Sequence, residues 1–448
     1  MSFWKGLLTA RSHIAFLIGL SLALALIWRL EAGAPPAPVG GVEDFAKLLK
    51  TTGARAVPLR PTGVPLTPDE LAVARTAWRY FERNHHPSTG LVNSVDGYPS
   101  TTLWDLGSYL MGLLAAQDLG LIDEPTFTAR AEPLLASLAR LPLVDGQLPN
   151  KAYDARTLQM VDYRGRKTPK GIGWSVIDIA RLGVPLDILA WSRPDLTDRV
   201  RAILARWRLD RAVADGRLQG ALRTANGKLR LVQEGRYGYE QYAAKLLFLL
   251  GADTSRALRY DLDIELLPVD GQLVAADRRL PADHGGTHNA VISEPYILEA
   301  LEFGLTATTL PIARAVYQAQ ENHARETHRL TAVSEDNIDR PPYFVYNSVI
   351  NDRQPWAAFT PDGKDAAAHK SLSLKAALGW SYIFAGPYAG QLRAAAATLA
   401  DPQRGFYSGR YDADGAPNKA LTANTNGVVL ETLWYHVRGP LLQAARSR

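Results

Sequence analysis

Two acidic residues of this sequence directly follow an aromatic residue at the start of a predicted helix. Asp105 follows Trp104, and Glu240 follows Tyr239 within residues 237–242, a segment that holds three tyrosines. Aromatic walls exclude water from a carboxyl group, which raises its pKa and favours the protonated form that a general acid needs. Glu240 is therefore the candidate acid, although a first-turn acid can also simply complement the helix dipole or cap the helix.

A second acidic segment contains Glu335, Asp336 and Asp339. Acidic runs are usually solvated, but this one leads into residues 341–347, which are rich in proline and aromatic side chains. One of these three acids, or Asp105, is the candidate general base, and the sequence does not decide among them.

The predicted helix starts and loops also carry side chains that suit a sugar. Pyranose faces stack on aromatic rings, and polar side chains pair with hydroxyl groups. Glycoside cleavage needs one protonated and one ionised carboxyl group. The candidate substrate-binding residues are Trp104, Asn150, Lys151, Tyr153, Arg156, Trp174, Asp178, Tyr239, Tyr242, Glu294, Tyr343 and Asn426.

Other chemistries lack sequence support. The chain has no cysteine, which excludes disulfides and thiolate metal sites. His284 and His288 are four residues apart, but the glycines between them predict a loop, and no acidic third ligand follows. The glycine-rich phosphate and dinucleotide motifs and the serine-nucleophile motif are absent. We expect neither a metal nor a cofactor.

Composition indicates a large folded protein that does not bind nucleic acid. The 448 residues are 47% hydrophobic and 21% charged, which is enough apolar material for a sizeable core. The formal net charge is only +5, and no stretch is dense in lysine and arginine. A nucleic-acid-binding surface needs a more concentrated positive charge.

The N-terminus predicts export. Lys5 and Arg11 precede an apolar run over 14–28 whose only polar member is Ser21. Residues 1–30 are either an uncleaved signal anchor, which would hold the protein in the inner membrane through residues 13–30, or a cleaved signal peptide. In both cases the basic residues stay in the cytoplasm and the rest enters a bacterial periplasm. A Pro/Gly-rich linker over 31–63 and one domain over 64–448 would follow.

The domain is predicted to be all-α. One set of helices has a polar face, and another begins with a polar or aromatic signature and continues apolar. Starts of the second set fall at Trp104, Trp174, Tyr239, Ser293 and Asn426, with one more expected near 364–373, which gives an average spacing of about 64 residues. Six helical hairpins of this kind predict an (α/α)6 toroid, with an open solenoid as the alternative.

The connections in such a toroid would form long loops and small β-hairpins at one end. Asp-Gly pairs recur at 145–146, 215–216, 270–271 and 414–415, as expected of tight turns. A closed ring also brings the starts of its inner helices around one cavity, so the candidate residues would converge there.

Residues from about 67 to 434 resemble a bacterial family of unknown function. Its fold is a glucoamylase-like (α/α)6 toroid, distantly similar to the endo-β-1,2-glucanases. The resemblance implies an inverting hydrolysis with a glutamic acid near mid-chain, to which Glu240 corresponds in kind and rough position, whereas no motif identifies the base. The stretches that carry it are 102–107, 149–153, 171–175, 237–242 and 334–337.

Three functions are consistent with these patterns. The first is an envelope-located glycoside hydrolase, inverting, that cleaves a bacterial glucan or exopolysaccharide. The second is a non-catalytic glycan-binding or scaffold subunit that works with other components of a polysaccharide synthesis and export system. The third is a polysaccharide lyase that uses tyrosine and histidine in place of paired carboxylates.

Overall fold

The computed structural model of this protein describes residues 41–51, 57–282 and 286–447. The predicted signal segment 1–30, part of the predicted linker and His284 lie outside the described residues. The chain divides into two units, Met1–Gly41 and Val42–Arg448, and the second is the one described below. Within the described residues, no helix has both the length and the apolar character needed to span a bilayer.

An inner ring of helices forms the centre of this second unit. Each inner helix contacts the next, and α14 contacts α5, so the described helices close on themselves and the fold is an α/α toroid rather than an open solenoid. Their first residues lie within three residues of the predicted starts, and α12 begins directly after the predicted segment 364–373. The inner helices are α5 (Leu103–Asp118), α7 (Val176–Ser192), α9 (Tyr239–Leu249), α10 (Glu294–Leu298) with the π-helical turn η4 (Glu299–Phe303), α12 (Leu374–Ile383) and α14 (Ala423–Arg438).

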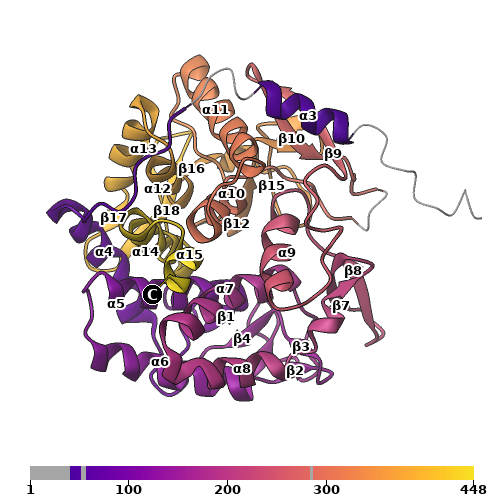
Figure 1. Cartoon of the computed structure of the whole chain (residues 1–448), viewed down its shortest axis with the longest axis vertical. Helices are drawn as coiled ribbons and strands as arrows, with labels where there is room; N and C mark the ends of the chain where they lie inside the picture. The colour runs from indigo at the N-terminus through magenta and orange to yellow at the C-terminus, as the bar shows by residue number, and fades with distance from the viewer. Residues whose placement is uncertain (1–40, 52–56, 283–285, 448) are drawn as a thin grey trace, which may run out of the picture. The chain divides into compact units, whose positions relative to one another are not determined.

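Outer helices surround this ring (Figure 1). The outer helices are α4 (Pro68–Asn84), α6 (Glu124–Arg140), α8 (Thr197–Ala205), α11 (Thr309–Thr327) and α13 (Pro387–Ala397). Between α9 and α10, the described chain forms the hairpin of β9 (Ile264–Val269) and β10 (Gln272–Asp277) where the six-hairpin scheme expects an outer helix. The Asp270-Gly271 turn lies between two runs rich in β-branched and leucine residues, which favours strands here.

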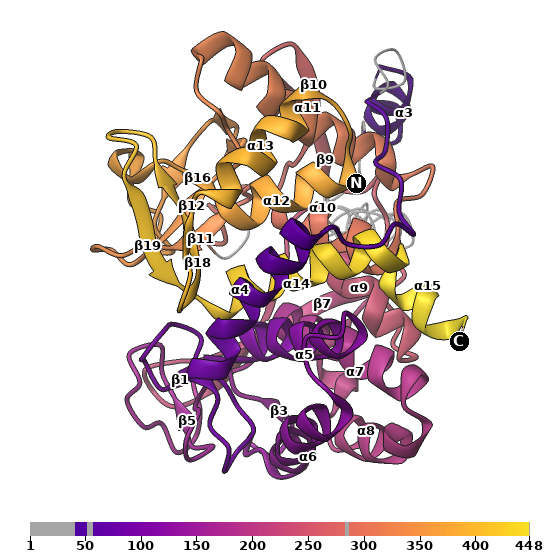
Figure 2. The ribbon, with the colours of Figure 1, turned by 90° about the vertical axis from the view of Figure 1, so that its left-hand side faces the viewer.

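Small antiparallel sheets gather at one end of the ring. Figure 2 shows β1, β5, β11, β12, β16, β18 and β19 on the side opposite α15. Asp215 and Asp270 have φ of 50° and 43°, and the glycine after each also has positive φ, as a two-residue hairpin turn requires. The remaining strands are β1 (Ser100–Thr102), β2 (Leu143–Val144), β3 (Leu148–Pro149), β4 (Ala152–Asp154), β5 (Met160–Val161), β6 (Val213–Ala214), β7 (Arg217–Arg223), β8 (Leu229–Gln233), β11 (Glu335–Asn337), β12 (Phe344–Asn347), β13 (Ile350–Asn351), β14 (Gln354–Pro355), β15 (Ala358–Phe359), β16 (Ser371–Ser373), β17 (Ala400–Asp401), β18 (Gly405–Tyr411) and β19 (Pro417–Leu421).

A buried ion-pair group lies inside the ring. Arg181 of α7 pairs with Glu302 of η4, and its Nη2 lies 2.7 Å from Oε2 of Glu431 on α14. All three side chains are fully buried. Because the partners come from three inner helices, this group ties the opposite sides of the ring together.

The segment before α4 packs on the toroid and is not a free linker throughout. Gly41–Thr51 form helix α3, and the amide of Arg60 donates to the carbonyl of Ile383 at 2.9 Å. A capping box then starts α4: the Thr67 hydroxyl accepts from the Glu70 amide at 3.3 Å, and Glu70 accepts from the Thr67 amide at 2.9 Å. The C-terminus forms the short helix α15 (Leu441–Arg446).

Candidate active site

Three carboxyl groups meet around one lysine at the N-terminal end of the inner helices. We call Glu294, Glu335 and Asp336 the carboxylate cluster. Glu294 begins α10, the other two acids lie on β11, and Lys375 lies in the first turn of α12. The ammonium of Lys375 pairs with Glu294 and lies 3.8 Å from Oδ1 of Asp336. All four side chains are buried or nearly so.

Glu294 has several hydrogen-bond donors. Its Oε1 accepts from Nδ2 of Asn424 at 2.8 Å and from the indole N–H of Trp104 at 3.3 Å, while Oε2 faces Lys375. An amide, an indole and an ammonium group therefore all direct N–H groups at this carboxyl group, an arrangement that suits a carboxylate. Trp104 and Tyr239 meet edge to face beside it, with ring centroids 5.4 Å apart.

Glu335 is the acid best placed to hold a proton. Burial raises its pKa to about 8, and the nearby charge of Glu294 adds to the rise, whereas Lys375 opposes it. The hydroxyl of Tyr239 donates a hydrogen bond to Oε1 of Glu335. A carboxyl group with a pKa near 8 is protonated at neutral pH and can donate that proton.

Asp336 is less well satisfied. Burial raises its pKa to about 7, and Lys375 counteracts part of that rise. Neither of its carboxyl oxygens has a hydrogen-bond partner of good geometry among the described residues, although Ser373 and Lys375 lie close enough to lower its pKa. Buried polar atoms without partners are uncommon and mark places where a ligand or water is needed.

A second acid pair lies at the start of α7. Burial raises the pKa of Asp178 to about 7, the charge of Glu234 adds to the rise, and a 3.0 Å hydrogen bond from Ser175 opposes it. Glu234 also accepts from the Val176 amide at 2.7 Å, and Lys151 lies close enough to lower the pKa of both acids. Asp178 and Glu234 are partly exposed, unlike the carboxylate cluster.

Tyr346 of β12 links the two groups of acids. Burial raises the pKa of its phenol, and the charges of Glu335 and Asp178 add to that rise. Its ring stacks on Phe359 with centroids 5.1 Å apart, which fixes the ring in place. The two acid groups therefore border one region at the same end of the toroid.

Asp105 lies close by but has a local structural role. Its carboxylate accepts from Ser94 at 2.5 Å and from the Thr102 hydroxyl at 2.6 Å, and its amide donates to the Thr102 hydroxyl at 3.1 Å. These contacts fix the first turn of α5, the helix that carries Trp104. Burial raises the pKa of Asp105, against the hydrogen bonds that it accepts.

Glu240, the predicted acid, is not part of the carboxylate cluster. Its side chain is 1% exposed, and its two oxygens lie 2.6 Å from Nη2 of Arg279 and 3.4 Å from Nη1 of Arg217. Burial raises its pKa, but both guanidinium groups oppose that rise. Through these two arginines, Glu240 connects α9 to β7 and to the segment after β10. An acid enclosed in this way is poorly placed to give a proton to a substrate.

Asp339, a predicted base, also serves a structural purpose. It accepts from the Tyr411 hydroxyl at 2.6 Å and from the Lys419 amide at 3.0 Å, which joins the loop after β11 to β18 and β19. Burial raises its pKa, but these hydrogen bonds outweigh burial and hold the pKa below its usual range.

Of the predicted binding residues, Trp104, Lys151, Asp178, Tyr239 and Glu294 lie around the acid groups. The others support the loops, are held in the core or lie away from the acids. Asn150 is fully buried and holds a loop through the Ile172 amide at 2.7 Å. Trp174 is also fully buried, the Tyr153 hydroxyl donates to the carbonyl of Pro142, and the Tyr242 hydroxyl donates to Glu302. Arg156 pairs with Asp154, and the side chain of Asn426 accepts from the backbone amide of Phe406. Tyr343, between β11 and β12, is 61% exposed.

Sequence reasoning missed Glu234, Tyr346, Lys375 and Asn424. Lys375 lies two residues after the segment in which the sixth inner helix start was expected, so this start could have been searched for charged residues. Asn424 lies two residues before Asn426, which was the predicted binding residue. Only the observed start of α14 shows which of the two asparagines faces the acids. Glu234 follows a strand, and nothing local in the sequence connects it to Asp178.

Together these groups offer acid-base chemistry beside aromatic rings. Glu335 has a pKa of about 8, Asp336 and Asp178 each have a pKa of about 7, and Glu294 pairs with an ammonium group. Among the described residues, no group of three or more His, Asp or Glu side chains is arranged to hold a metal ion.

The fold is an α/α toroid whose inner helices begin beside a group of buried and partly buried acids. The chain belongs to DUF3131, a family of proteins of unknown function, whose model matches residues 72–439. This confirms the resemblance noted from the sequence. No curated protein matches the chain.

Several solved structures share the toroid. A candidate glucoamylase from Bacteroides caccae superposes with a TM-score of 0.59 at 16% identity, covering 85% of this chain and 95% of that one. An endo-β-1,2-glucanase from Chitinophaga pinensis, in complex with sophorotriose and glucose, gives 0.56 at 13% identity, with 85% and 96% covered. An endo-β-1,2-glucanase from Talaromyces funiculosus with sophorose gives 0.55 at 11% identity, with 85% and 86% covered. At these identities the likeness shows the fold.

Proposed function

We propose that this protein is a glycoside hydrolase that cleaves a neutral bacterial glucan by inversion. The observation that carries the proposal is the pair of unlike carboxyl environments at one end of the toroid. Glu335 has a pKa of about 8 and holds a proton, while Asp178 has a pKa of about 7 and ionises first. Glycoside hydrolysis needs such a protonated and ionised pair.

Glu335 is the proposed acid. It would protonate the leaving glycosidic oxygen, with the hydroxyl of Tyr239 orienting its carboxyl group. Glu294 pairs with Lys375, and its charge adds to the rise in the pKa of Glu335, so its proposed role is to tune and position the acid.

Asp178 is the proposed base. It is partly exposed, so a water molecule can reach it, whereas Asp336 is 3% exposed. The charges of Asp178 and Glu335 both act on Tyr346, so the two acids lie near the same phenol, and the sugar ring and the attacking water are proposed to lie between them. Inverting enzymes keep their acid and base about 6.5–9.5 Å apart for this reason.

The charge of the region around these acids favours a neutral glycan over a polyanionic one. Five carboxyl groups border it, against the ammonium groups of two lysines; the acids are Asp178, Glu234, Glu294, Glu335 and Asp336, and the lysines are Lys151 and Lys375. A lyase needs positive groups to neutralise the uronate that it acts on. The lyase hypothesis therefore has less support than hydrolysis.

Two of the similar structures are endo-β-1,2-glucanases, and one of them holds sophorotriose and glucose. A linear β-1,2-glucan is therefore the first substrate to test. Trp104 and Tyr239, both partly exposed beside Glu294, are the proposed stacking platform for a glucosyl ring.

We also propose that the toroid works in the bacterial periplasm. The support is the predicted export segment, in which Lys5 and Arg11 precede the apolar run 14–28. Anchoring in the inner membrane and association with other polysaccharide-machinery subunits remain proposals that rest on that segment alone.

Product analysis tests the enzymatic function. The full-length protein is incubated with linear β-1,2-, β-1,3- and β-1,4-glucans, and new reducing ends are quantified beside a Glu335→Gln control. We expect release from at least one neutral glucan by the wild type and none above background by the variant. Proton NMR of the first product should show the anomer opposite to that of the cleaved bond. Absence of release from every glucan, with binding retained, would support the scaffold alternative.

A further inference from the structure

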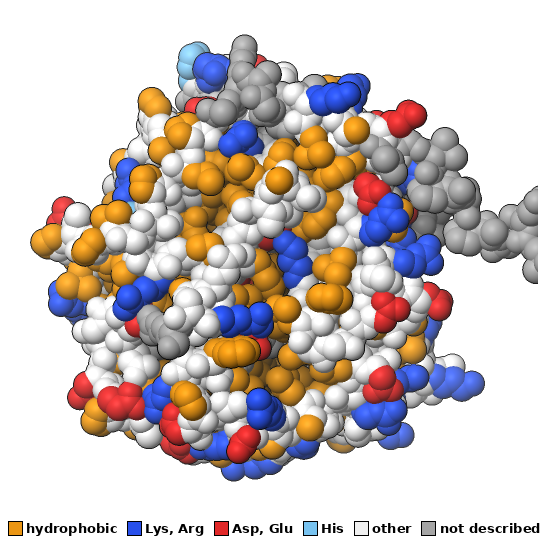
Figure 3. Space-filling view, in the orientation of Figure 1, with side chains coloured by type: hydrophobic (Ala, Val, Ile, Leu, Met, Phe, Trp, Pro, Cys, Tyr) orange, Lys and Arg blue, Asp and Glu red, His pale blue; other side chains and the backbone are white. Residues whose placement is uncertain are grey.

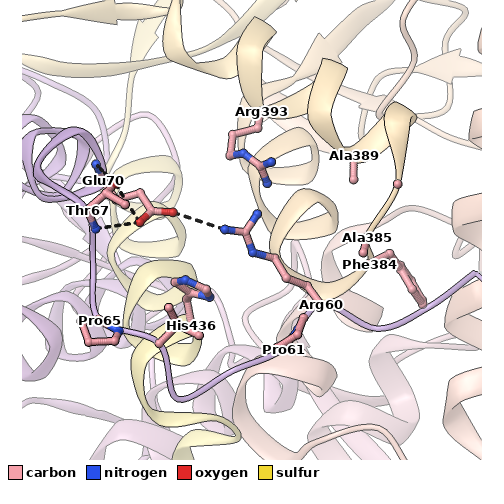
Figure 4. A pocket seen from close by; sticks show the side chains of 12 residues that line it. Arg60, Pro61, Pro65, Thr67, Glu70, Phe384, Ala385, Ala389, Arg393 and His436 are labelled. Atoms are coloured by element: carbon pink, nitrogen blue, oxygen red, sulfur yellow. Dashed lines mark hydrogen bonds and ion pairs between the residues drawn. The ribbon is translucent and has the colours of Figure 1, made fainter.

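A cavity of about 380 Å³ lies at the opposite end of the ring from the carboxylate cluster. It is lined by the segment before α4, by the residues between α12 and α13, and by His436 near the end of α14 (Figure 4). Lys375 and the cavity residue Phe384 are nine residues apart along α12 and the residue after it, which corresponds to about 13 Å at 1.5 Å per residue. The cavity is therefore separate from the candidate active site.

Two guanidinium groups face this cavity. Figure 4 shows the guanidinium groups of Arg60 and Arg393 close to each other, with Glu70 beside that of Arg60. Arg60 lies 3.4 Å from Glu70, whereas Arg393 donates only to the carbonyl of Ser381, at 3.0 Å, and has no carboxylate partner among the described residues. Both guanidinium groups lie against the ring of Tyr382, at 4.5 and 5.6 Å from its centroid. Because, in the described part of the chain, Glu70 pairs only with Arg60, the two neighbouring guanidinium groups leave a positive charge that an anion can neutralise.

The start of α13 adds to this positive potential. Gly386 and Ala389, in and just before its first turn, line the cavity. The first amides of a helix have no partner within the helix, and the helix dipole places partial positive charge there. An oxyanion in the cavity would lie near these amides and both guanidinium groups, as in other helix-terminus anion sites.

His436 supplies an unsatisfied polar atom. Its side chain is 3% exposed, its ring meets that of Tyr382 edge to face, and Nδ1 has no hydrogen-bond partner among the described residues. Burial lowers the pKa of this histidine, and Arg60 lowers it further. A neutral imidazole with a free ring nitrogen can take part in a hydrogen bond to a ligand.

Apart from Thr67, the rest of the lining is apolar. Pro61, Val64, Pro65 and Phe384 cover the other walls. A second cavity of about 260 Å³ shares Thr67, Glu70 and Arg393 with the first, and it extends along Val73, Leu374 and Leu378. Figure 3 shows the face at this end of the ring, where apolar side chains are exposed between lysine and arginine side chains. A ligand here would thus pair one anionic group with a compact apolar part.

We propose that this cavity is a binding site for a small organic oxyanion, a carboxylate or phosphate monoester with a short apolar chain. The anionic group binds between Arg393 and the free edge of Arg60, at the start of α13 and beside His436. The apolar chain lies against Pro61, Val64 and Phe384. The proposal does not depend on the function of the carboxylate cluster.

Calorimetric titration of the full-length protein tests the site. Hexanoate and hexyl phosphate are the probes, which distinguish a carboxylate from a phosphate ligand, and hexanamide is the uncharged control. We expect saturable binding of at least one anion and none of hexanamide. Arg393→Gln should weaken binding by at least about tenfold, since a charge-assisted pair is lost. The matched change Arg83→Gln, at an exposed arginine of α4 outside the cavity, should leave it unchanged.

A second variant guards against misfolding of the first. Val64 is 43% exposed at the cavity wall, so Val64→Glu adds a negative charge without removing a core side chain. It should weaken anion binding while the melting temperature stays close to that of the wild type. Equal binding of hexanamide and hexanoate, unchanged affinity in both variants, or no saturable binding of either anion would overturn the proposal.

Discussion

Glu335 and Glu240 are both buried acids beside the start of α9, but their neighbours differ. Glu335 has Glu294 next to it, whose charge favours the neutral form against the opposing charge of Lys375, and the Tyr239 hydroxyl orients its carboxyl group. Glu240 has two guanidinium groups, which favour its charged form. At the scale of single residues, the sign of the neighbouring charges therefore decides which acid can donate a proton.

The pH dependence of hydrolysis follows from these groups. Glu335 must be protonated, so kcat/KM should fall as pH rises through about 8. Asp178 must be ionised, so kcat/KM should fall as pH drops through about 7. The plot of kcat/KM against pH should be bell-shaped, with its maximum between these values. Because the acids interact, the two apparent pKa values of the plot describe the group of acids and not single residues. Activity that keeps rising well above pH 8 would contradict the assignment.

The stability of a Glu335→Gln variant should also depend on pH. The folded-state pKa of Glu335 is raised from 4.5 to about 8, so the folded protein binds the extra proton and the wild type loses stability as pH rises between these values. Glutamine does not titrate. The melting temperature of the variant relative to the wild type should therefore increase from pH 5 to pH 8, as scanning calorimetry can measure. A constant difference over that range would show that Glu335 is not protonated in the folded protein.

The sequence allowed part of the site to be predicted at this scale. Trp104, Asp178, Tyr239 and Glu294 were expected to converge because they begin inner helices, and in the structure they surround the acid groups. The sequence could not distinguish Glu240 from Glu335, because the arginines that enclose Glu240 come from β7 and from the segment after β10. Such contacts depend on the tertiary fold and have no local signal.

At the scale of elements, the helix starts were predicted from a polar or aromatic signature, and the structure shows that side-chain caps fix several of them. Thr67 caps α4, and Thr102, Ser175 and Thr422 cap the inner helices α5, α7 and α14 through their side-chain oxygens. The hairpin of β9 and β10 was not predicted as a replacement for an outer helix. A repeat pattern describes the average unit, whereas local strand-forming residues determine this exception.

Glycines in the inner helices allow the ring to close. A Cβ added at Gly427 of α14 would lie 2.6 Å from the carbonyl oxygen of Ser108 on α5, whereas one added at Gly390 of the outer helix α13 would meet nothing within 4 Å. Gly427→Ala should therefore destabilise the protein by about 1–3 kcal/mol through overpacking. Gly390→Ala should stabilise it by about 0.4–1 kcal/mol, because alanine restricts the unfolded chain and fits the helix. Urea denaturation of both variants measures the contrast, and equal effects would argue against close packing at this contact.

At the scale of the whole molecule, the first and last inner helices meet, and Arg181 connects three sides of the ring. Arg181→Gln would leave Glu302 and Glu431 buried without their cation. Removing one member of a buried ion-pair group typically costs about 3–5 kcal/mol. Arg446→Gln, which breaks the partly exposed pair of α15 with Asp187, should cost less than about 1 kcal/mol. Chemical denaturation gives both values, and a small effect at Arg181 would show that the ring does not depend on this group.

The toroid also separates two kinds of site. The inner helices begin at the acid groups and end near the cavity of Arg60 and Arg393. The sequence predicted the closed ring from its repeat spacing, and hence the convergence of the inner helix starts. It did not predict the cavity, because its walls come from the segment before α4 and from the ends of α12 and α14, which no repeat pattern describes.

The central claim is that the acid of this site is Glu335 and that Glu240 has a structural role. The most direct measurement compares Glu335→Gln with Glu240→Gln on the glucan that the wild type cleaves, at the pH of maximal activity. We predict that Glu335→Gln lowers kcat by about 10²–10⁴-fold with a wild-type fold. Glu240→Gln should lower the melting temperature and change kcat only a few-fold in the folded fraction. Loss of turnover in a stably folded Glu240→Gln protein, with Glu335→Gln still active, would contradict the account.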